Sequence, residues 1–168
     1  MLAHPEGYPL MKPCLDSAAA HAAESGSFRV VDSMDEAFEG ADAVYPKSWG
    51  PYGLMLSRVE ANRARDSKRM VEIEKEALAQ NARHRDWICD ERRMGLTRGG
   101  DALYMHCLPA DIGAEVSPGV MARHAVNVAR EANWKVYVIM AALATAKVKD
   151  LSARLASLER DKDSTLSS

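Results

Sequence analysis

Short apolar runs and longer segments with helical spacing alternate along this chain. The short runs predict strands at Leu2–Pro5, Phe28–Val31, Ala41–Tyr45, Ala102–Met105 and Val126–Val128. Segments whose apolar residues recur three or four apart predict helices over Pro13–Glu24, Ser33–Gly40, Asp66–Arg83 and Trp134–Leu158, with another beginning at Ser117. Strands that alternate with helices favour an α/β fold, in which a parallel sheet is covered on both faces.

Local signals place several helix ends. Pro13 suits the first position of its helix, and Gly26 suits the residue after its end. Ser33 and Glu36 form a capping box, in which the serine hydroxyl accepts from the Glu36 amide. Ser117 stands before a proline as a second N-cap. The apolar positions expected to face the core are Leu15, Ala18, Ala19 and Ala22 in one helix and Met70, Ile73, Ala77 and Leu78 in another.

Composition narrows the class of protein. The chain has 168 residues, 47% of them hydrophobic and 27% charged, which is ordinary for one soluble domain. Its net charge of −2 gives no electrostatic basis for binding nucleic acid or an anionic membrane. The apolar run Val136–Ala146 is shorter than the roughly 20 residues that span a bilayer, and the first residues do not resemble a signal peptide. We therefore expect neither nucleic acid nor a membrane as a partner.

The cysteines give no metal or disulfide signal. Cys14, Cys89 and Cys107 cannot all pair with one another, and none belongs to a Cys-x-x-Cys spacing. The pattern therefore predicts no disulfide framework, no zinc site and no metal. A reducing, cytoplasmic location is the simplest context for such a chain.

Three segments with charged or reactive side chains directly follow predicted strands. They are Pro46–Trp49, Cys107–Pro109 and Glu131–Lys135. Because ligands of open α/β sheets bind at the carboxyl ends of strands, we expect these segments to converge on one small-molecule site. The alternative is a buried strand end at which His106 and Cys107 only pack, since a free cysteine is often a small core residue.

The segment Met105-His106-Cys107-Leu108-Pro109-Ala110 carries a family resemblance. Its His-Cys-Leu-Pro core resembles the signature of the aspartate/ornithine carbamoyltransferase family. Residues 2–149 follow the order of that family's second, amino-acid-binding domain. The stretches Tyr45–Trp49, Ala79–Asn81 and Met105–Asp111 resemble the YgeW-like branch of knotted carbamoyltransferases. The resemblance implies a three-layer, Rossmann-like substrate domain over residues 1–150, then the end of a C-terminal helix and a polar tail over residues 151–168.

The resemblance also implies a reaction and residue roles. An amine or amide nitrogen attacks carbamoyl phosphate and phosphate leaves, with no metal or organic cofactor. The backbone carbonyls of Cys107 and Leu108 would accept from the carbamoyl amino group, and the Cys107 thiol would lie near the attacking nucleophile. Pro109 would keep the loop rigid, because this catalysis depends on positioning. His106 would orient the loop, and direct contact with the ligand is the alternative.

Lys47 and Lys135 depart from the family pattern. Lys47 stands where ornithine carbamoyltransferases carry an aspartate for the substrate's α-amino group. A cation there favours an anionic second substrate, such as an oxamate-like amide or amine, over ornithine; the alternative is a solvated surface lysine. Ser48 and Trp49 would add a hydroxyl and an aromatic wall. Lys135 is the nearest match to an arginine that contacts carbamoyl phosphate, and it keeps the charge without the planar fork.

Other family motifs are missing from the chain. Neither Ser-x-Arg-Thr nor His-Pro-x-Gln, which the family uses for carbamoyl phosphate, occurs here. By the resemblance, the first strand–helix unit and the whole carbamoyl phosphate domain are also missing. We therefore expect the chain alone to be inactive and to need that domain in cis or in trans. Family enzymes are commonly trimers joined largely through the first domain, so the resemblance suggests a homotrimer for the whole enzyme and leaves the oligomeric state of this chain open.

Two other interpretations stay open. A non-catalytic remnant or protein-binding module would retain only the fold. A nucleotide-binding domain of another family is disfavoured, because no Gly-x-Gly-x-x-Gly follows a predicted strand. An apolar face of the last predicted helix also indicates a partner polypeptide or poor solubility; its residues are Tyr137, Val138, Ile139, Met140 and Leu143.

Overall fold

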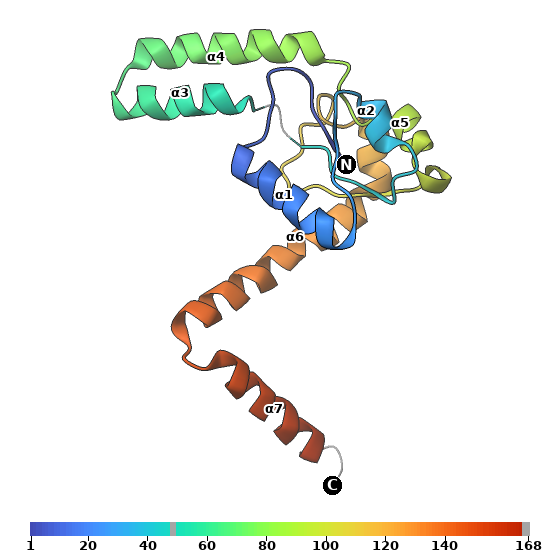
Figure 1. Cartoon of the computed structure of the whole chain (residues 1–168), viewed down its shortest axis with the longest axis vertical. Helices are drawn as coiled ribbons and strands as arrows, with labels where there is room; N and C mark the ends of the chain where they lie inside the picture. The colour runs from blue at the N-terminus through green and yellow to red at the C-terminus, as the bar shows by residue number, and fades with distance from the viewer. Residues whose placement is uncertain (48–49, 166–168) are drawn as a thin grey trace. The chain divides into compact units, whose positions relative to one another are not determined.

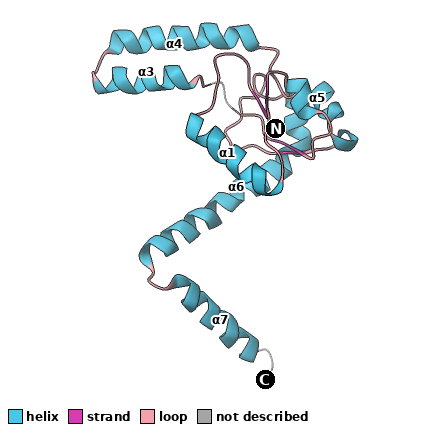
Figure 2. Cartoon of the chain, viewed as in Figure 1, coloured by secondary structure: helices cyan, strands magenta, loops and turns pink. Residues whose placement is uncertain are grey.

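The computed structural model describes residues 1–47 and 50–165. They belong to two compact units, Met1–Val128 and a second unit that starts at Ala129. Helices dominate the described chain (Figure 2). They are α1 (Lys12–Ser25), α2 (Met34–Phe38), α3 (Tyr52–Arg63), α4 (Ser67–Asn81), α5 (Glu91–Leu96), α6 (Pro118–Lys147) and α7 (Leu151–Thr165), with 3-10 turns η1 (Ala82–His84) and η2 (Arg98–Gly100). Within residues 1–47 and 50–165, no helix is both long and apolar enough to cross a membrane.

The strands form two parallel pairs. Strand β1 (Leu2–Ala3) pairs with β2 (Val30–Val31), and β3 (Ala43–Val44) pairs with β4 (Leu103–Tyr104). Each of these strands is two residues long, shorter than the apolar run that predicted it. Helices fill the connections between paired strands, as parallel pairing requires. The predicted α/β class is therefore confirmed.

Three of the predicted signals, at Gly26, Ser33 and Ser117, agree with the structure. Gly26 is the first residue after α1, whereas Pro13 is the second residue of this helix, one past the predicted first position. The Ser33 hydroxyl accepts from the Glu36 amide at 3.3 Å and opens α2. The Ser117 hydroxyl accepts from the amide of Val120 at 3.2 Å and opens α6. Short-range capping chemistry was readable because both partners lie within one turn.

The predicted apolar faces are correct except at two residues. On α4, Ile73 is fully buried and Met70 and Ala77 are half-buried, but Leu78 is 61% exposed. Leu78 is five residues past Ile73, which turns its side chain about 140° away on a helix of 3.6 residues per turn. On α1, the predicted face is half-buried at three positions and exposed at Ala19. The helical period was right, and the width of each buried stripe was overestimated.

Helix α3 was not predicted from the sequence. It lies antiparallel beside α4 (Figure 1). The turn between them holds Arg65 at a φ of 55°, and the Asp66 amide donates to the Ala61 carbonyl at 2.9 Å. A signal was present, since large apolar residues recur three and four apart in α3. They are Tyr52, Met55, Leu56 and Val59, all of them exposed.

The predicted strand at Val126–Val128 is wrong, because these residues lie inside α6. Val120, His124 and Val128 are its buried residues and recur every four positions, which is a helix face. Helix continuation from the Ser117 cap overrides the strand preference of isolated β-branched residues. The helix predicted over Trp134–Leu158 is divided between two helices in the structure. Helix α6 ends at Lys147, and α7 begins at Leu151, directly after Asp150, which has a φ of 54°.

The first unit has one apolar core, which β3, β4 and the start of α6 share with α2 and α5. Its buried residues are Met34, Phe38, Val44, Cys89, Met94, Ala102, Tyr104, Val116, Val120 and Val128. Burial raises the pKa of the Cys89 thiol to about 12. Cys89 therefore acts as a small core residue.

An ion cluster joins α2 to α5. The Asp35 carboxylate accepts from both Nη atoms of Arg92, at 2.7 and 2.8 Å, and from Nε of Arg93 at 2.8 Å. These hydrogen bonds lower the pKa of Asp35 to about 2. Arg93 also donates to the carbonyls of Asp86 and Ile88, at 2.6 and 2.9 Å. The cluster fixes the segment that leads into α5 against the helix that precedes β3.

Candidate functional site

The β3–β4 pair brings two of the predicted site segments side by side. Val44 pairs with Tyr104, and the Met105 amide donates to the Val44 carbonyl at 2.9 Å. The chain therefore leaves both strands in the same direction. Just past the pair, the rings of Tyr45 and His106 stack with centroids 6.4 Å apart and planes 11° apart. This register places the segment that ends at Lys47, which is exposed, next to the segment that begins at His106.

His106 is fully buried and hydrogen-bonded on both ring nitrogens. The Leu108 amide donates to Nδ1 at 2.9 Å, and Nε2 lies 3.1 Å from Oε2 of Glu115. The ring stacks on Tyr104 as well as on Tyr45, at a centroid distance of 6.4 Å. The bond between the Leu108 amide and His106 is compatible with the predicted loop-orienting role, which stays a prediction. Direct contact of His106 with a ligand stays an untested alternative.

The loop after His106 has an unusual backbone. Leu108 has a φ of 47°, in the left-handed region that residues with a Cβ rarely adopt, and the Leu108–Pro109 peptide is cis. The Cys107 side chain is half-buried, whereas Leu108 and Pro109 are exposed. The loop therefore presents part of its surface to solvent beside the β3 segment, as a binding loop must.

His124 lies on the other side of Tyr104, at the buried face of α6. Its ring centroid is 5.8 Å from that of Tyr104, and Arg123 Nε donates to its Nε2 at 3.1 Å. Burial lowers the pKa of His124, and the positive charge of Arg123 lowers it further, while Asp101 opposes the shift. The ring is therefore held in its neutral form.

The remaining predicted site residues are Ser48, Trp49 and Lys135. Ser48 and Trp49 lie outside the described residues. Lys135 is exposed and lies well inside α6, in the second unit. The prediction that Glu131–Lys135 is a loop after a strand, just before a helix, is wrong because α6 begins at Pro118. Only the resemblance still supports a role for Lys135.

Glu115 was missed from the sequence. It is 7% exposed, and its Oε2 also accepts from the Asp111 amide at 3.0 Å. Its backbone is fixed as well, because its carbonyl accepts from the Cys89 amide at 2.9 Å. A single carboxylate between Ala114 and Val116, just ahead of a helix cap, was the available signal.

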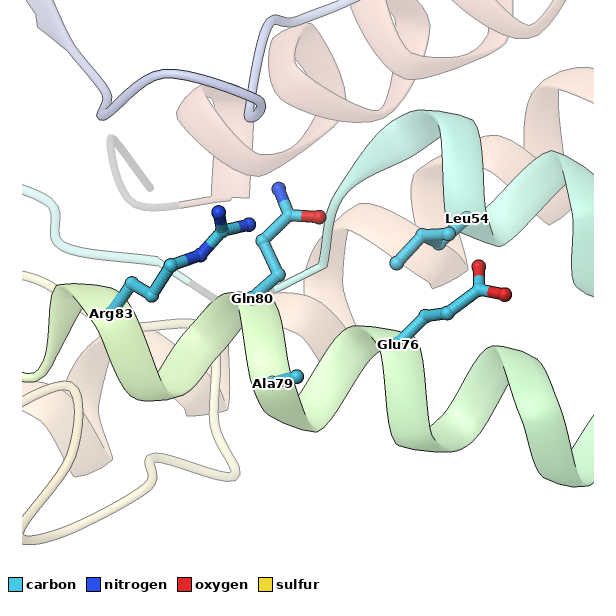
Figure 3. A pocket seen from close by; sticks show the side chains of 5 residues that line it. All are labelled: Leu54, Glu76, Ala79, Gln80 and Arg83. Atoms are coloured by element: carbon cyan, nitrogen blue, oxygen red, sulfur yellow. The ribbon is translucent and has the colours of Figure 1, made fainter.

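A surface hollow lies between α3 and α4 (Figure 3). It has a volume of about 480 Å³ and is lined by Leu54, Glu76, Ala79, Gln80 and Arg83. In Figure 3, Gln80 extends from the same face of α4 as Glu76. Nε2 of Gln80 donates to the Gly7 carbonyl at 3.2 Å, and the Tyr8 hydroxyl donates to Asn81 at 2.6 Å. These bonds attach the loop after β1 to the end of α4, so part of the Ala79–Asn81 motif has a structural role.

Comparison with known proteins identifies relatives over most of the chain. The family described as aspartate/ornithine carbamoyltransferase, Asp/Orn binding domain, matches residues 1–146. YgeW of Escherichia coli (strain K12), which carries a provisional carbamoyltransferase name, is 48% identical over 167 residues, covering 95% of this chain and 42% of YgeW. An N-acetylornithine carbamoyltransferase of Xanthomonas campestris is 33% identical over 140 residues, covering 81% of this chain and 36% of the enzyme. The chain therefore spans less than half the length of these relatives.

Solved structures give the same picture. A variant of N-acetyl-L-ornithine transcarbamylase complexed with carbamyl phosphate and N-succinyl-L-norvaline matches with a TM-score of 0.52 and 30% identity, over 71% of this chain and 31% of that one. Acetylornithine transcarbamylase complexed with acetylcitrulline matches with a TM-score of 0.52 and 32% identity, over the same shares of the two chains.

Proposed function

Because the chain belongs to the aspartate/ornithine carbamoyltransferase family, whose Asp/Orn-binding domain it carries, we propose that it is the second-substrate half of a carbamoyltransferase. The group acceptor is an anionic small molecule with an amine or amide nitrogen. The observation that carries this proposal is the register of β3 and β4, which puts the Lys47 segment beside the Cys107–Pro109 loop.

The proposed reaction is carbamoyl transfer. The acceptor nitrogen attacks the carbonyl carbon of carbamoyl phosphate, and a nitrogen–carbon bond forms. The bond from that carbon to the phosphate oxygen breaks, and phosphate leaves with the bonding pair. The nitrogen gives up one proton, which leaves with phosphate or solvent. Orientation and charge stabilisation supply the catalysis, so the loop must hold the reactants closely.

The Cys107–Pro109 loop takes the carbamoyl group in this proposal. The carbonyls of Cys107 and Leu108 accept from the carbamoyl amino nitrogen, and the Cys107 thiol faces the acceptor. The half-buried thiol and the exposed Leu108 and Pro109 are compatible with these roles. Pro109 restricts the backbone. The buried His106 supports the loop by accepting a hydrogen bond from the Leu108 amide.

Lys47 sets the charge of the acceptor in this proposal. It is exposed, two residues past Tyr45, whose ring stacks on His106. A cation at this position favours a carboxylate. A mutant of a relative with 30% identity is complexed with N-succinyl-L-norvaline, whose succinyl group ends in a carboxylate. That ligand supports an anionic acceptor for this chain too, and an oxamate-like molecule is the simplest example. Ornithine, with a second amino group, is disfavoured.

The carbamoyl phosphate domain belongs to the proposed enzyme as a partner in cis or in trans. The chain spans 42% of YgeW, and its sequence has neither carbamoyl phosphate motif of the family. The proposed holoenzyme joins both domains, as a homotrimer by analogy with the family, and works in the cytoplasm on small molecules. It needs no metal or organic cofactor.

The proposal is tested by co-expressing this chain with the remaining part of the Escherichia coli relative and measuring phosphate release from carbamoyl phosphate. Oxamate and N-acylated amino acids with a free carboxylate are expected to accelerate release, whereas ornithine is not. Lys47→Glu should lower the rate with oxamate by about tenfold or more, because one charge-assisted contact is lost and reversed.

The matched control is Lys75→Glu, since Lys75 is an exposed lysine on α4 and the change in charge is the same. A rate equally lowered by both variants, or a preference for ornithine, would contradict the anionic-acceptor proposal. Carbamoyl phosphate binding without any phosphate release would instead support the non-catalytic interpretation.

A further inference from the structure

The Glu115 carboxylate is a buried charge that the proposed reaction does not use directly. Only 7% of the residue is exposed. Its Oε2 lies 3.1 Å from His106 Nε2 and accepts from the Asp111 amide at 3.0 Å. A buried carboxylate is costly unless it is hydrogen-bonded. Packing alone therefore does not explain a carboxylate at this buried position next to His106.

The hydrogen bonds define the protonation of His106. A backbone amide can only donate, so Nδ1 must accept from Leu108 and carries no proton. The proton of the ring is then on Nε2, where it is donated to the Glu115 carboxylate. A carboxylate can only accept, so Glu115 favours this tautomer over the other one.

The tautomer matters because of the backbone that it supports. Leu108 has a φ of 47°, a left-handed conformation that costs free energy in a residue with a Cβ. The bond from its amide to Nδ1 of His106 offsets this cost. The other tautomer would set an N–H against the Leu108 N–H and remove the bond.

We propose that Glu115 is a positioning residue, which holds His106 in the Nε2–H tautomer so that the Leu108 amide stays bound to Nδ1 and the Cys107–Pro109 loop keeps its shape. Glu115 acts through His106 and does not touch the substrate. The proposal rests on the proposed function only for its consequence in catalysis, since the hydrogen-bond chain itself is independent of any activity.

The first test is spectroscopic and uses the full 168-residue chain. Long-range proton–nitrogen NMR of the ¹⁵N-labelled protein is expected to show a protonated Nε2 and an unprotonated Nδ1 for His106. Glu115→Leu should populate the other tautomer and move the Leu108 amide resonance. The control Asp111→Asn removes a neighbouring, exposed carboxylate but keeps the amide that Glu115 binds, and should leave both signals unchanged.

Glu115→Gln keeps the experiment decisive if Glu115→Leu does not fold. The glutamine carbonyl can still accept from Nε2, so the tautomer should persist while the Nε2 resonance shifts with the loss of charge. Identical His106 and Leu108 resonances in Glu115→Gln and the unmodified chain would overturn the proposal. So would a His106 ring protonated on Nδ1 in the unmodified chain.

A second test measures carbamoyl phosphate affinity in the co-expressed two-domain protein. Glu115→Leu should weaken binding about tenfold, the factor typical of losing a hydrogen bond to a charged group, and Glu115→Gln should restore most of it. In a His106→Asn background, Glu115→Leu should have no further effect, because Glu115 acts through His106. Additive effects would mean that Glu115 acts independently, through Asp111, and would contradict the proposal.

The two tests separate this inference from the proposed function. If the unmodified two-domain protein does not bind carbamoyl phosphate, the proposed function fails. The NMR tautomer still confirms or overturns the hydrogen-bond chain in that case.

Discussion

His124 shows how a single buried side chain makes this fold sensitive to pH. Its Nε2 accepts from Arg123, so protonation would remove that bond and add a second positive charge beside the guanidinium. Burial and Arg123 lower its pKa in the fold, whereas the unfolded chain has a pKa near 6.5. At a pH between these two pKa values, His124 is protonated in the unfolded chain and neutral in the folded chain.

The free energy of unfolding is therefore expected to fall as pH decreases below about 6.5. His124→Gln should reduce this slope, because glutamine cannot take up the proton. Urea unfolding curves at pH 7.5, 6.5 and 5.5 measure the effect, with circular dichroism at pH 7.5 to confirm that the variant is folded. Equal pH slopes for the variant and the unmodified chain would exclude His124 as the cause.

At the scale of elements, α4 depends on the side chain that caps it. The Asp66 carboxylate accepts from the Arg69 amide at 2.9 Å, and the Asp66 amide closes the turn after α3. Asp66 therefore forms hydrogen bonds with both the start of α4 and the end of α3.

Asp66→Ala is expected to lower the free energy of unfolding by about 1 kcal/mol, because one amide of the first turn loses its acceptor. Asp66→Asn keeps an acceptor in the same place and should cost much less. Urea unfolding at pH 7 compares the two. An equal loss in both variants would mean that charge, and not capping, is what Asp66 contributes.

For the whole molecule, the apolar surface of α6 past Val128 is the main unexplained feature. More than half of each of these large side chains is exposed: Trp134, Val136, Tyr137, Val138, Ile139, Met140 and Leu143. Contiguous apolar patches of this kind indicate a partner or a tendency to aggregate. The prediction of a polypeptide partner or poor solubility thus stands, and it agrees with the proposed need for a second domain.

The isolated chain is expected to self-associate and to bind a hydrophobic dye. Ile139→Lys with Leu143→Lys places two charges one turn apart on this surface and should reduce both dye fluorescence and the sedimentation coefficient. Thr145→Lys adds a charge without removing a large apolar side chain, so it serves as the control. If the unmodified chain is monomeric and does not bind the dye, this surface does not cause self-association.

Family membership and local helix signals were readable from the sequence, because both depend on residues close together in the chain. The His106–Pro109 signature, the Ser33 and Ser117 caps and the period of α4 needed no tertiary information. Errors arose where competing local patterns had to be weighed. Val126–Val128 has strand-like residues but lies in a helix that starts at the Ser117 cap, and this error also misplaced Lys135.

The α/β class, the family and the loop that carries the signature could all be read from the order of residues. Which groups meet at that loop depends on the folded arrangement. Pairing of β3 with β4 joins segments some sixty residues apart, and burial brings Glu115 to His106 across a turn. Hydrogen bonds and desolvation act through space, so a carboxylate with no recognisable motif became the candidate for positioning the loop.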